Sequence, residues 1–187
     1  MYEAETIKRA SQGDDAAWMA VMQSHQQAVF RLAYLLLRDA DEAEDVAQET
    51  FIRAFRALHR FDHERPFRPW LLQITANLSR NRQRSMRRYL AMLGRLGRSQ
   101  PEPVAFNGER SGPQWEADQL WRAISRLRMV DREILYLRYF LDLTESEVAS
   151  MLHVAPGTVK SRLSRATSHL RTLVDREFPS LREERQA

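Results

Sequence analysis

The sequence predicts an all-α protein made of two small helical domains joined by a flexible linker. Apolar residues recur three or four positions apart along nearly the whole chain, which is the spacing of an amphipathic helix. The strict apolar–polar alternation typical of β-strands is absent. One stretch, "GRLGRSQPEPVAFNGERSGP" (94–113), contains four Gly and three Pro, and this composition predicts a linker rather than a helix.

The first domain is expected over residues 1–93. Its apolar periodicity predicts helices at 3–12, 14–38, 41–60 and 67–90. Acidic residues occupy the start of the third helix, where they complement the helix dipole. The fourth helix follows a loop that contains Pro66 and Pro69, and it carries the apolar stripe Leu71, Ile74 and Leu78.

The second domain is expected over residues 114–175, followed by a tail at 176–187. The same periodicity predicts helices at 116–127, 131–140, 144–151 and 157–175. Thr144 with Glu147 three residues later is a capping-box signature for the start of the third of these helices. Pro156 suits the first turn of the last helix, because its missing N–H costs little there.

The composition argues against several classes of protein. The 187 residues are 43% hydrophobic, which suffices for packed cores. There is no Cys, so disulfides and thiolate metal sites are excluded and a reducing compartment is expected. The start of the chain has no apolar signal region, and the longest apolar run, Leu32–Leu37, is far too short to span a membrane. These features predict a cytoplasmic protein without membrane insertion.

Charge is unevenly distributed, although the formal net charge is only +4. An acidic block precedes a run of arginines that no acidic residue interrupts. The block consists of Asp39, Asp41, Glu42, Glu44, Asp45 and Glu49, and the run of Arg80, Arg82, Arg84, Arg87, Arg88, Arg95 and Arg98. This pattern suggests two different partners, one polyanionic and one locally basic.

The stretch "LTESEVASMLHVAPGTVKSRLSRA" (143–166) has the pattern of a helix-turn-helix. The first helix places Val148, Met151 and Leu152 inward, and the small Ala149 lets a second helix cross closely. If the turn requires a positive φ, His153 is among the better non-Gly residues for it. An apolar stripe then follows along the second helix, formed by Val159, Leu163, Ala166, Leu170 and Leu173.

The opposite face of that second helix is polar and basic. In helix-turn-helix geometry it lies in the major groove, with Ser161 and Arg165 toward the bases. Lys160 and Arg162 at the edges of this face would meet phosphates. The backbone N–H groups of Gly157 and Thr158 would meet a phosphate at the helix N-terminus. The pattern alone leaves open an antiparallel helix pair with a solvated basic face.

Two stretches of the first domain carry further candidate binding residues. In "DADEAEDVAQETFIRAFRALHRF" (39–61), Asp45, Gln48, Glu49 and Ile52 share a face, while Val46, Phe51, Phe55 and Leu58 point elsewhere. An acidic strip beside exposed aromatic residues would suit a basic protein partner. Helix capping and solubility explain the acids equally well.

The stretch "FDHERPFRPWLLQITANLSRNRQR" (61–84) combines aromatic, Arg and Asn side chains. The polar residues Asn77, Arg80, Asn81 and Arg84 share one helix face. Aromatic rings stack on bases, amides read base edges and Arg holds phosphates, so this combination favours binding of a single strand. Phe67 and Trp70 have a competing interpretation as core residues, which is favoured for Trp70.

Together these three stretches resemble the two-domain sigma factors of bacteria, the extracytoplasmic-function (ECF) group. "DEAEDVAQETFIRAFRAL", "FRPWLLQITANLSRNRQR" and the helix-turn-helix stretch occur in the order and spacing of that family. The resemblance implies a first domain like sigma region 2 and a second like region 4. It implies core RNA polymerase, through its β′ clamp helices and β flap, and promoter DNA, both duplex and melted, as partners. Members of this group are often held by an anti-sigma factor, although no residue here identifies one.

The resemblance also assigns roles to particular residues. Those implied to bind the β′ clamp helices are Asp45, Gln48, Glu49, Phe51 and Phe55. Those implied to contact the minus-ten element are Arg65, Phe67, Arg68, Asn77, Arg80, Asn81 and Arg84. Those implied to contact the minus-thirty-five element are Gly157, Thr158, Lys160, Ser161, Arg162 and Arg165.

The expected function is that of a promoter-specificity subunit, which directs core polymerase to specific promoters and assists their opening. The alternative is a sigma-like adaptor that binds regulators without recognising promoters, but such a protein should lack the basic faces. A helical nuclease ranks last, because the five His residues are scattered without ligand spacing and there is no Walker-type Gly loop. We therefore expect neither enzyme activity nor a cofactor.

Overall fold

The computed structural model describes residues 2–95 and 113–178. Within these two ranges the chain forms helices and no strand, so the predicted all-α class is confirmed. Most of the expected linker (94–113) and tail (176–187) lies outside the described residues. No helix in the described part of the chain is both long and apolar enough to cross a bilayer.

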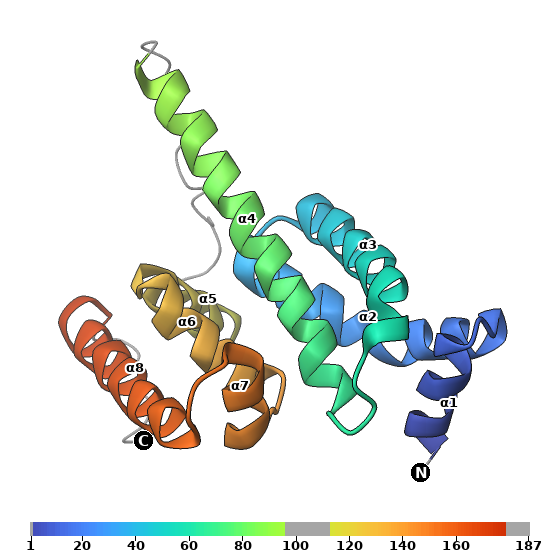
Figure 1. Cartoon of the computed structure of the whole chain (residues 1–187). Coiled ribbons are helices and arrows are strands. Elements are labelled where there is room, and N and C mark those ends of the chain that lie inside the picture. Colours follow the sequence, from blue (N-terminus) through green and yellow to red (C-terminus); the bar gives the residue numbers. More distant parts are fainter. Residues whose placement is uncertain (1, 96–112, 179–187) are drawn as a thin grey trace.

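Residues 2–95 form a bundle in which the other helices pack around α2 (Asp15–Leu37). Its elements are α1 (Tyr2–Ser11), α2 (Asp15–Leu37), α3 (Ala40–Ala57), the 3₁₀ helix η1 (Leu58–Arg60) and α4 (Phe67–Arg95). Helices α1, α3 and α4 all pack against α2, and α4 extends well beyond its neighbours (Figure 1). The last helix is therefore longer than the predicted 67–90.

Hydrogen bonds and backbone conformation at single residues determine where α2 begins and ends and where α3 begins. The carboxylates of Asp14 and Asp39 cap the two N-termini, each accepting a hydrogen bond from a backbone N–H three residues on, at 2.9 and 3.0 Å. Arg38 ends α2 in the left-handed conformation, at φ 62°. Its N–H donates to the carbonyl of Tyr34 at 2.8 Å, and the chain then turns back so that α3 lies along α2.

The core of this bundle is made by apolar residues that α2 and α4 direct at each other. Val29, Leu32, Leu71 and Leu72 are completely buried. Each buried side chain of this size stabilises a fold by about 1.5–3 kcal/mol relative to an exposed one. The packing of α4 on α2 is therefore the main interaction that orients the polar face of α4.

Residues 113–178 form a second helical bundle. Its elements are α5 (Pro113–Arg126), α6 (Met129–Leu135), η2 (Tyr136–Phe140), α7 (Glu145–Leu152) and α8 (Pro156–Glu177). The predicted helix at 131–140 is divided, because η2 is a π-helix in which the N–H of Leu141 donates to the carbonyl of Tyr136 at 3.1 Å. The apolar spacing of this segment does not distinguish a π-turn from an α-turn, so periodicity predicts a helix without revealing its type.

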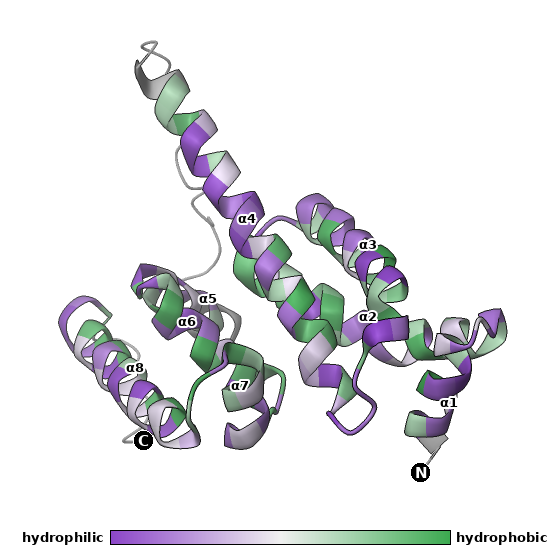
Figure 2. Cartoon of the chain, in the orientation of Figure 1, coloured by the Kyte–Doolittle hydropathy of each residue, from purple (hydrophilic) through white to green (hydrophobic). Residues whose placement is uncertain are grey.

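The two bundles are in contact with each other. Helix α7 packs against α4, and η2 packs against α2. One cluster of buried apolar residues runs through both bundles without a break. Figure 2 shows hydrophobic residues on the sides of the helices that face one another, whereas the part of α4 that extends beyond its neighbours mixes hydrophobic and hydrophilic residues.

Candidate nucleic-acid interface

Helices α7 and α8 form the predicted helix-turn-helix. The capping box is present: the Thr144 hydroxyl accepts from the N–H of Glu147 at 3.2 Å, and a Glu147 carboxylate oxygen accepts from the N–H of Thr144 at 2.8 Å. His153 ends α7 with φ 52°, the left-handed conformation that the sequence allowed for this position. The two helices are thus joined by a short turn whose geometry is set by local residues.

The buried side and the exposed side of α8 are the ones that its apolar periodicity predicted. Val159, Leu163 and Ala166 are buried in the second bundle. Lys160, Ser161, Ser164 and Arg165 are exposed on the outer face, and Arg162 at its edge is half-buried. The Arg165 Nε donates to the carbonyl of Ser161 at 3.2 Å, which holds the guanidinium along the outer surface of the helix.

The first turn of α8 is less open than expected. The N–H of Thr158 donates to the carbonyl of Ala155 at 2.9 Å, so this group is already used within the helix start. Gly157 is exposed, and a Cβ added there would meet no atom within 4 Å. The surface at Gly157 is therefore open to solvent at this end of α8.

The acidic strip predicted on α3 is exposed but partly neutralised within the chain. Arg82 of α4 forms ion pairs with Glu42 and, at 3.2 Å, with Asp45. Glu49 accepts from the Nε of Arg53 at 2.6 Å. Gln48 next to them is exposed. The strip is therefore a mixed polar surface in which carboxylates alternate with arginines.

The aromatic residues expected on the same helix differ in exposure. Phe51 is half-buried against Trp18, with ring centroids 6.3 Å apart. Phe55 contacts the same Trp18 at 5.3 Å but remains 46% exposed, and Ile52 beside it is 45% exposed. Phe55 and Ile52 thus form an apolar edge beside the polar strip, whereas the sequence pattern placed Ile52 on the strip itself and expected Phe51 to be exposed as well.

The aromatic residues around the start of α4 form a packed cluster. Phe61, Phe67 and Trp70 lie with their ring centroids 4.8–5.4 Å apart. Trp70 packs against the hydrophobic core, which confirms its interpretation as a core residue. Phe67, which the resemblance implied as a minus-ten contact, is only 4% exposed, because the same cluster and His25 cover its ring.

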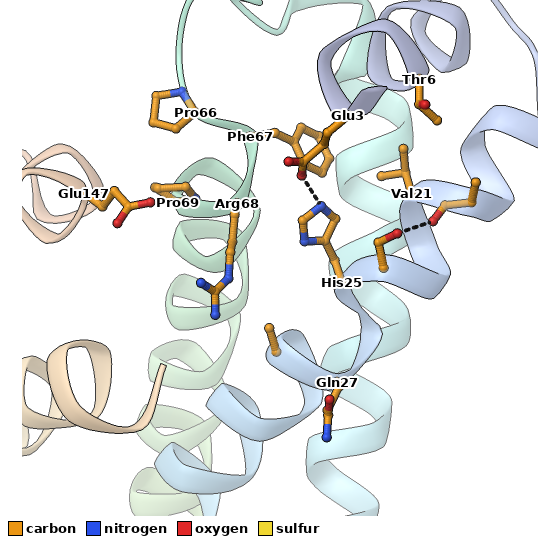
Figure 3. Close-up of a pocket in the computed structure, with 13 residues that line it drawn as sticks. Glu3, Thr6, Val21, His25, Gln27, Pro66, Phe67, Arg68, Pro69 and Glu147 are labelled. Atoms are coloured by element: carbon orange, nitrogen blue, oxygen red, sulfur yellow. Dashed lines mark hydrogen bonds and ion pairs between the residues drawn. The ribbon is translucent and has the colours of Figure 1, made fainter. Parts of the chain in front are cut away.

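A cleft of about 740 Å³ opens beside this cluster, between α1, α2, the start of α4 and α7. Figure 3 shows Phe67 and His25 in its wall, with Pro66 just before α4, Arg68 and Pro69 in its first turn, and Glu147 of α7 on the far side. Aromatic, cationic and hydrogen-bonding groups therefore line a single concave surface.

His25 is the buried titratable group of this cleft. Its Nε2 lies 2.9 Å from a carboxylate oxygen of Glu3. Burial lowers the pKa of His25, the charge of Arg68 lowers it further, and the Glu3 carboxylate opposes both effects. Sequence reasoning missed His25, since a lone His on an apolar helix face has no characteristic spacing.

The polar face of α4 carries the remaining residues expected at minus-ten DNA. Asn77, Asn81 and Arg84 are exposed. Arg80 is half-buried and donates from Nη2 to the Asn77 side-chain oxygen at 2.7 Å. Asn81 and Arg84 also line a shallow basic groove with Arg87 and Arg88. These residues thus form a continuous surface along α4.

Several residues of this surface contact the second bundle. The Arg68 Nη2 donates to the carbonyl of Leu141 at 2.9 Å, and the Arg65 Nη2 lies 3.5 Å from the Ser150 hydroxyl. Arg80 forms an ion pair with Glu133 at 3.6 Å. Glu133 was not identified from the sequence, because it is one of several charged residues in α6 and has no characteristic spacing, and only the packing of the two bundles brings it to α4.

Comparison with known families agrees with both bundles. The sequence model of the Sigma-70 region 2 family matches residues 21–89, and that of the Sigma-70 region 4 family matches residues 117–170. The first match covers α3 and most of α4, and the second covers the helix-turn-helix.

Full-length relatives and solved structures extend this agreement. The chain is 31% identical over 175 residues to the RNA polymerase sigma factor NccH of Alcaligenes xylosoxydans xylosoxydans, covering 89% of this chain and 91% of that protein. It is 31% identical over 173 residues to the ECF RNA polymerase sigma factor SigW of Bacillus subtilis, covering 88% and 92%. The fold is similar to that of CnrH in complex with the cytosolic domain of CnrY, with a TM-score of 0.71, 23% identity and coverage of 94% and 98%.

A second solved structure with a similar fold is the sigma factor RpoE of Bartonella quintana in complex with the anti-sigma factor NepR. The TM-score is 0.67 at 24% identity, covering 85% of this chain and 97% of that one. Helix pattern, family matches and full-length relatives therefore agree. The chain belongs to the ECF group of RNA polymerase sigma factors, the two-domain proteins that direct core polymerase to specific promoters.

Proposed function

We propose that the two bundles divide promoter recognition between them. The first, expected over 1–93, binds core polymerase through the polar strip of α3 and captures the minus-ten element along α4. The second, expected over 114–175, reads the minus-thirty-five element with α8. The observation that carries this division is the presence of two separate basic faces, one on α4 and one on α8.

The α8 face suits duplex DNA. Ser161 and Arg165 lie at its centre and are exposed, while Lys160 and Arg162 lie at its edges. An Arg in the major groove can pair with two acceptors of guanine, and Lys and Arg at the edges can neutralise phosphates. Gly157 and Thr158 at the start of α8 complete the proposed contacts to the DNA backbone, Thr158 through its side-chain hydroxyl because its N–H donates to Ala155.

The α4 face suits a melted strand. The cleft beside Phe67 and Arg68 has a cation at its rim and hydrogen-bonding groups along its wall, which can hold an unstacked base, whereas the covered ring of Phe67 supports the wall without stacking. Arg65, Asn77, Arg80, Asn81 and Arg84 would then follow the strand that leaves the cleft. Binding of the captured base offsets part of the unstacking cost, on the order of a few kcal/mol, so the chain assists promoter opening without a catalytic step of its own.

The strip of α3 suits a basic partner. Asp45, Gln48 and Glu49 present polar groups beside the exposed Phe55, with Phe51 supporting it from the core side. We assign this surface to the β′ clamp helices of core polymerase, and a second contact, between the second bundle and the β flap, would hold α8 over the duplex. The chain would act in the cytoplasm, where polymerase and chromosome are found.

Regulation by a bound partner protein belongs to the same proposal. The related CnrH and RpoE were solved with CnrY and with the anti-sigma factor NepR, respectively. No residue of this chain identifies such a partner. The adaptor alternative is less favoured, because a protein that binds only regulators has no need of the basic faces on α4 and α8.

Transcript sequencing after overexpression of the chain tests this function. The expected result is a set of transcripts that share one upstream motif with two elements, followed by transcription of that promoter in vitro with core polymerase and the purified chain. Transcripts without a shared motif, or a promoter that core polymerase uses equally without the chain, would contradict the proposal.

A further inference from the structure

Helix α2 has one side that the other described helices leave exposed. Helices α1, α3 and α4 pack against its remaining sides. The residues of the exposed side are spaced three or four positions apart, which places them in one row along the helix. They are Met19, Gln23, Gln26, Phe30 and Tyr34, and we call them the α2 face. Met19 is 57% exposed, and Phe30 and Tyr34 are each 40% exposed.

The α2 face carries no charge, although charged residues make up 29% of the chain. Between Ala16 and Leu37 the sequence contains a single Asp, Glu, Lys or Arg, which is Arg31. Arg31 follows Phe30 by about 100° around the helix, so it lies beside the face and not within it. Aromatic residues and Met without charges are typical of the buried centre of a protein interface. The composition of the α2 face therefore indicates a surface that docks another protein.

The two aromatic rings of the α2 face are already arranged for contact. Phe30 and Tyr34 stack with their ring centroids 6.2 Å apart and their planes 11° from parallel. The guanidinium of Arg38 lies 6.0 Å from the centre of the Tyr34 ring and 4.6 Å from that of Trp121, which restrains this end of the pair. Rings that are held in place before binding lose less conformational entropy on association.

The order of residues along the α2 face fits a second copy of the same helix in antiparallel orientation. With a two-fold axis beside Gln26, Met19 of one copy lies opposite Tyr34 of the other, and Gln23 lies opposite Phe30. The thioether of Met19 would then pack on the Tyr34 ring, and the two Gln26 amides would hydrogen-bond each other near the axis. The interface is isologous, because each copy contributes the same five residues.

Charge also favours a second copy on this side of the molecule. Each copy carries a formal net charge of +4, so pairing through its arginine-rich surfaces would be repulsive. In the antiparallel pair, Arg31 of one copy lies level with Met22 of the other. The two Arg31 residues are therefore about 13 Å apart along the helix axis, which exceeds the Debye length of about 8 Å at physiological salt.

The size of the α2 face sets the strength expected of this contact. From Met19 to Tyr34 the helix is about 22 Å long and about 10 Å wide, so the face covers roughly 220 Å². Stable complexes bury about 800 Å² on each partner. The contact is therefore too small for a permanent dimer, and monomer and dimer should exchange at micromolar or higher concentrations.

We propose that the free chain forms a weak symmetric dimer through the α2 face, with the two α2 helices antiparallel and meeting at Gln26. The cleft of Figure 3 lies on another side of α2, where His25 and Ala28 line it. The residues assigned to DNA and to core polymerase lie on α3, α4 and α8 and in the loop before α4. The proposal is therefore independent of the proposed function.

Sedimentation velocity of the full-length chain between about 5 and 300 µM tests the dimer, because mass action makes its population depend on concentration. The average sedimentation coefficient should rise over this range. Phe30→Glu and Met19→Glu should each raise the dissociation constant about tenfold or more, because each places a carboxylate in an apolar contact. Tyr89→Glu is the control, because it changes an aromatic residue of α4 that is 56% exposed and should leave the constant unchanged.

Cross-linking tests the antiparallel register. The chain has no native Cys, so Gln26→Cys gives each copy one reactive thiol. Packed helices lie about 8–10 Å apart, so a short bis-maleimide should join two copies rapidly at this position. Gln12→Cys, at an exposed Gln outside α2, is the control and should link slowly. Circular dichroism of every variant shows whether it is folded, and Met19→Glu, at the more exposed position, should fold even if Phe30→Glu does not.

Each of three results would overturn the proposal. The first is a chain that stays monomeric at every concentration, and if its Met19→Glu variant also bound core polymerase more weakly, the face would belong to the polymerase. The second is a dimer that both Glu substitutions leave intact, which would place the interface elsewhere. The third is equal linking of Gln26→Cys and Gln12→Cys, which would show that the two α2 helices do not meet at Gln26.

Discussion

His25 is a single residue whose burial should be visible in the stability of the protein. Burial lowers its pKa in the folded chain below the unfolded value of 6.5. The unfolded state therefore binds more protons in this window, and stability rises with pH. The contribution of neutral His25 is fully present above 6.5 and is lost as the pH falls through 6.5 toward the folded pKa.

As the pH is lowered from 7.5 to 5.5, we expect the free energy of unfolding to decrease, and part of this decrease should come from His25. The slope due to this one residue is at most about 1.4 kcal/mol per pH unit. His25→Gln should remove this component, measured by denaturant unfolding at several pH values. His59→Gln, at an exposed His, serves as the control and should keep it. An unchanged slope in His25→Gln would show that the burial of His25 has no such effect.

Arg165 carries the second prediction at the residue scale. Arg165→Ala should reduce promoter-specific transcription, since loss of a bidentate contact to a base costs about 1–3 kcal/mol. Core polymerase affinity should stay unchanged, because the side chain lies on the outer face of α8. Arg176→Ala near the end of the same helix is the control. Equal loss of transcription and core binding in Arg165→Ala would indicate a structural role instead.

Helix α3 is the element through which we expect the chain to bind core polymerase. Gln48→Ala combined with Glu49→Ala should lower the affinity for core polymerase by about tenfold, roughly 1.4 kcal/mol, while leaving oligonucleotide binding intact. The folded state should tolerate the change, because an exposed pair such as Glu49–Arg53 contributes only about 0.3–0.5 kcal/mol. Affinity can be measured by fluorescence titration of labelled chain with core enzyme.

The matched control for this pair is Glu5→Ala with Gln12→Ala, which removes the same two residue types from an exposed part of the chain near α1. Normal core binding by the α3 double variant would mean that the polar strip is a solvated helix face.

The stability of helix α7 should depend on the hydrogen bonds that cap its N-terminus. Thr144→Ala removes the side chain that accepts from the Glu147 N–H and should lower the free energy of unfolding by about 1 kcal/mol. Denaturant titration followed by circular dichroism measures this change. Thr172→Ala, at an exposed position of α8 where the hydroxyl bonds only to its own helix, should cost less. If Thr144→Ala lowered the free energy of unfolding by no more than Thr172→Ala, packing alone would determine where α7 begins.

At the scale of the whole molecule, the contact between the bundles should respond to a single like charge. Ser150→Arg places a second guanidinium beside Arg65, so it should widen the distance distribution of the free chain in small-angle scattering. Each 1.4 kcal/mol of lost contact energy lowers the ratio of closed to open chain about tenfold.

Thr172→Arg is the control for this variant, because it adds the same charge far from α4. The scattering curve of the control should match that of the natural chain. Equal widening in both variants would attribute the effect to net charge and not to the contact with Arg65.

Much of this molecule follows from its sequence. The period of apolar residues predicted the helices, Thr144 and Glu147 predicted a cap that the structure contains, and His153 suited the left-handed turn it occupies. The stripe of Val159, Leu163 and Ala166 determined which side of α8 is buried. All of these signals are local, because caps, turns and helix faces depend on residues only a few positions apart.

Tertiary structure decided the features that depend on distant partners. The sequence could not choose between stacking and burial for Phe67, because the choice depends on Phe61, Trp70 and His25 converging on its ring. Nor could it reveal that Arg80 meets Glu133, 53 positions away, because their pairing exists only where the two bundles touch. The sequence determines the chemistry of each side chain, whereas the packing of whole helices determines which distant residue it contacts.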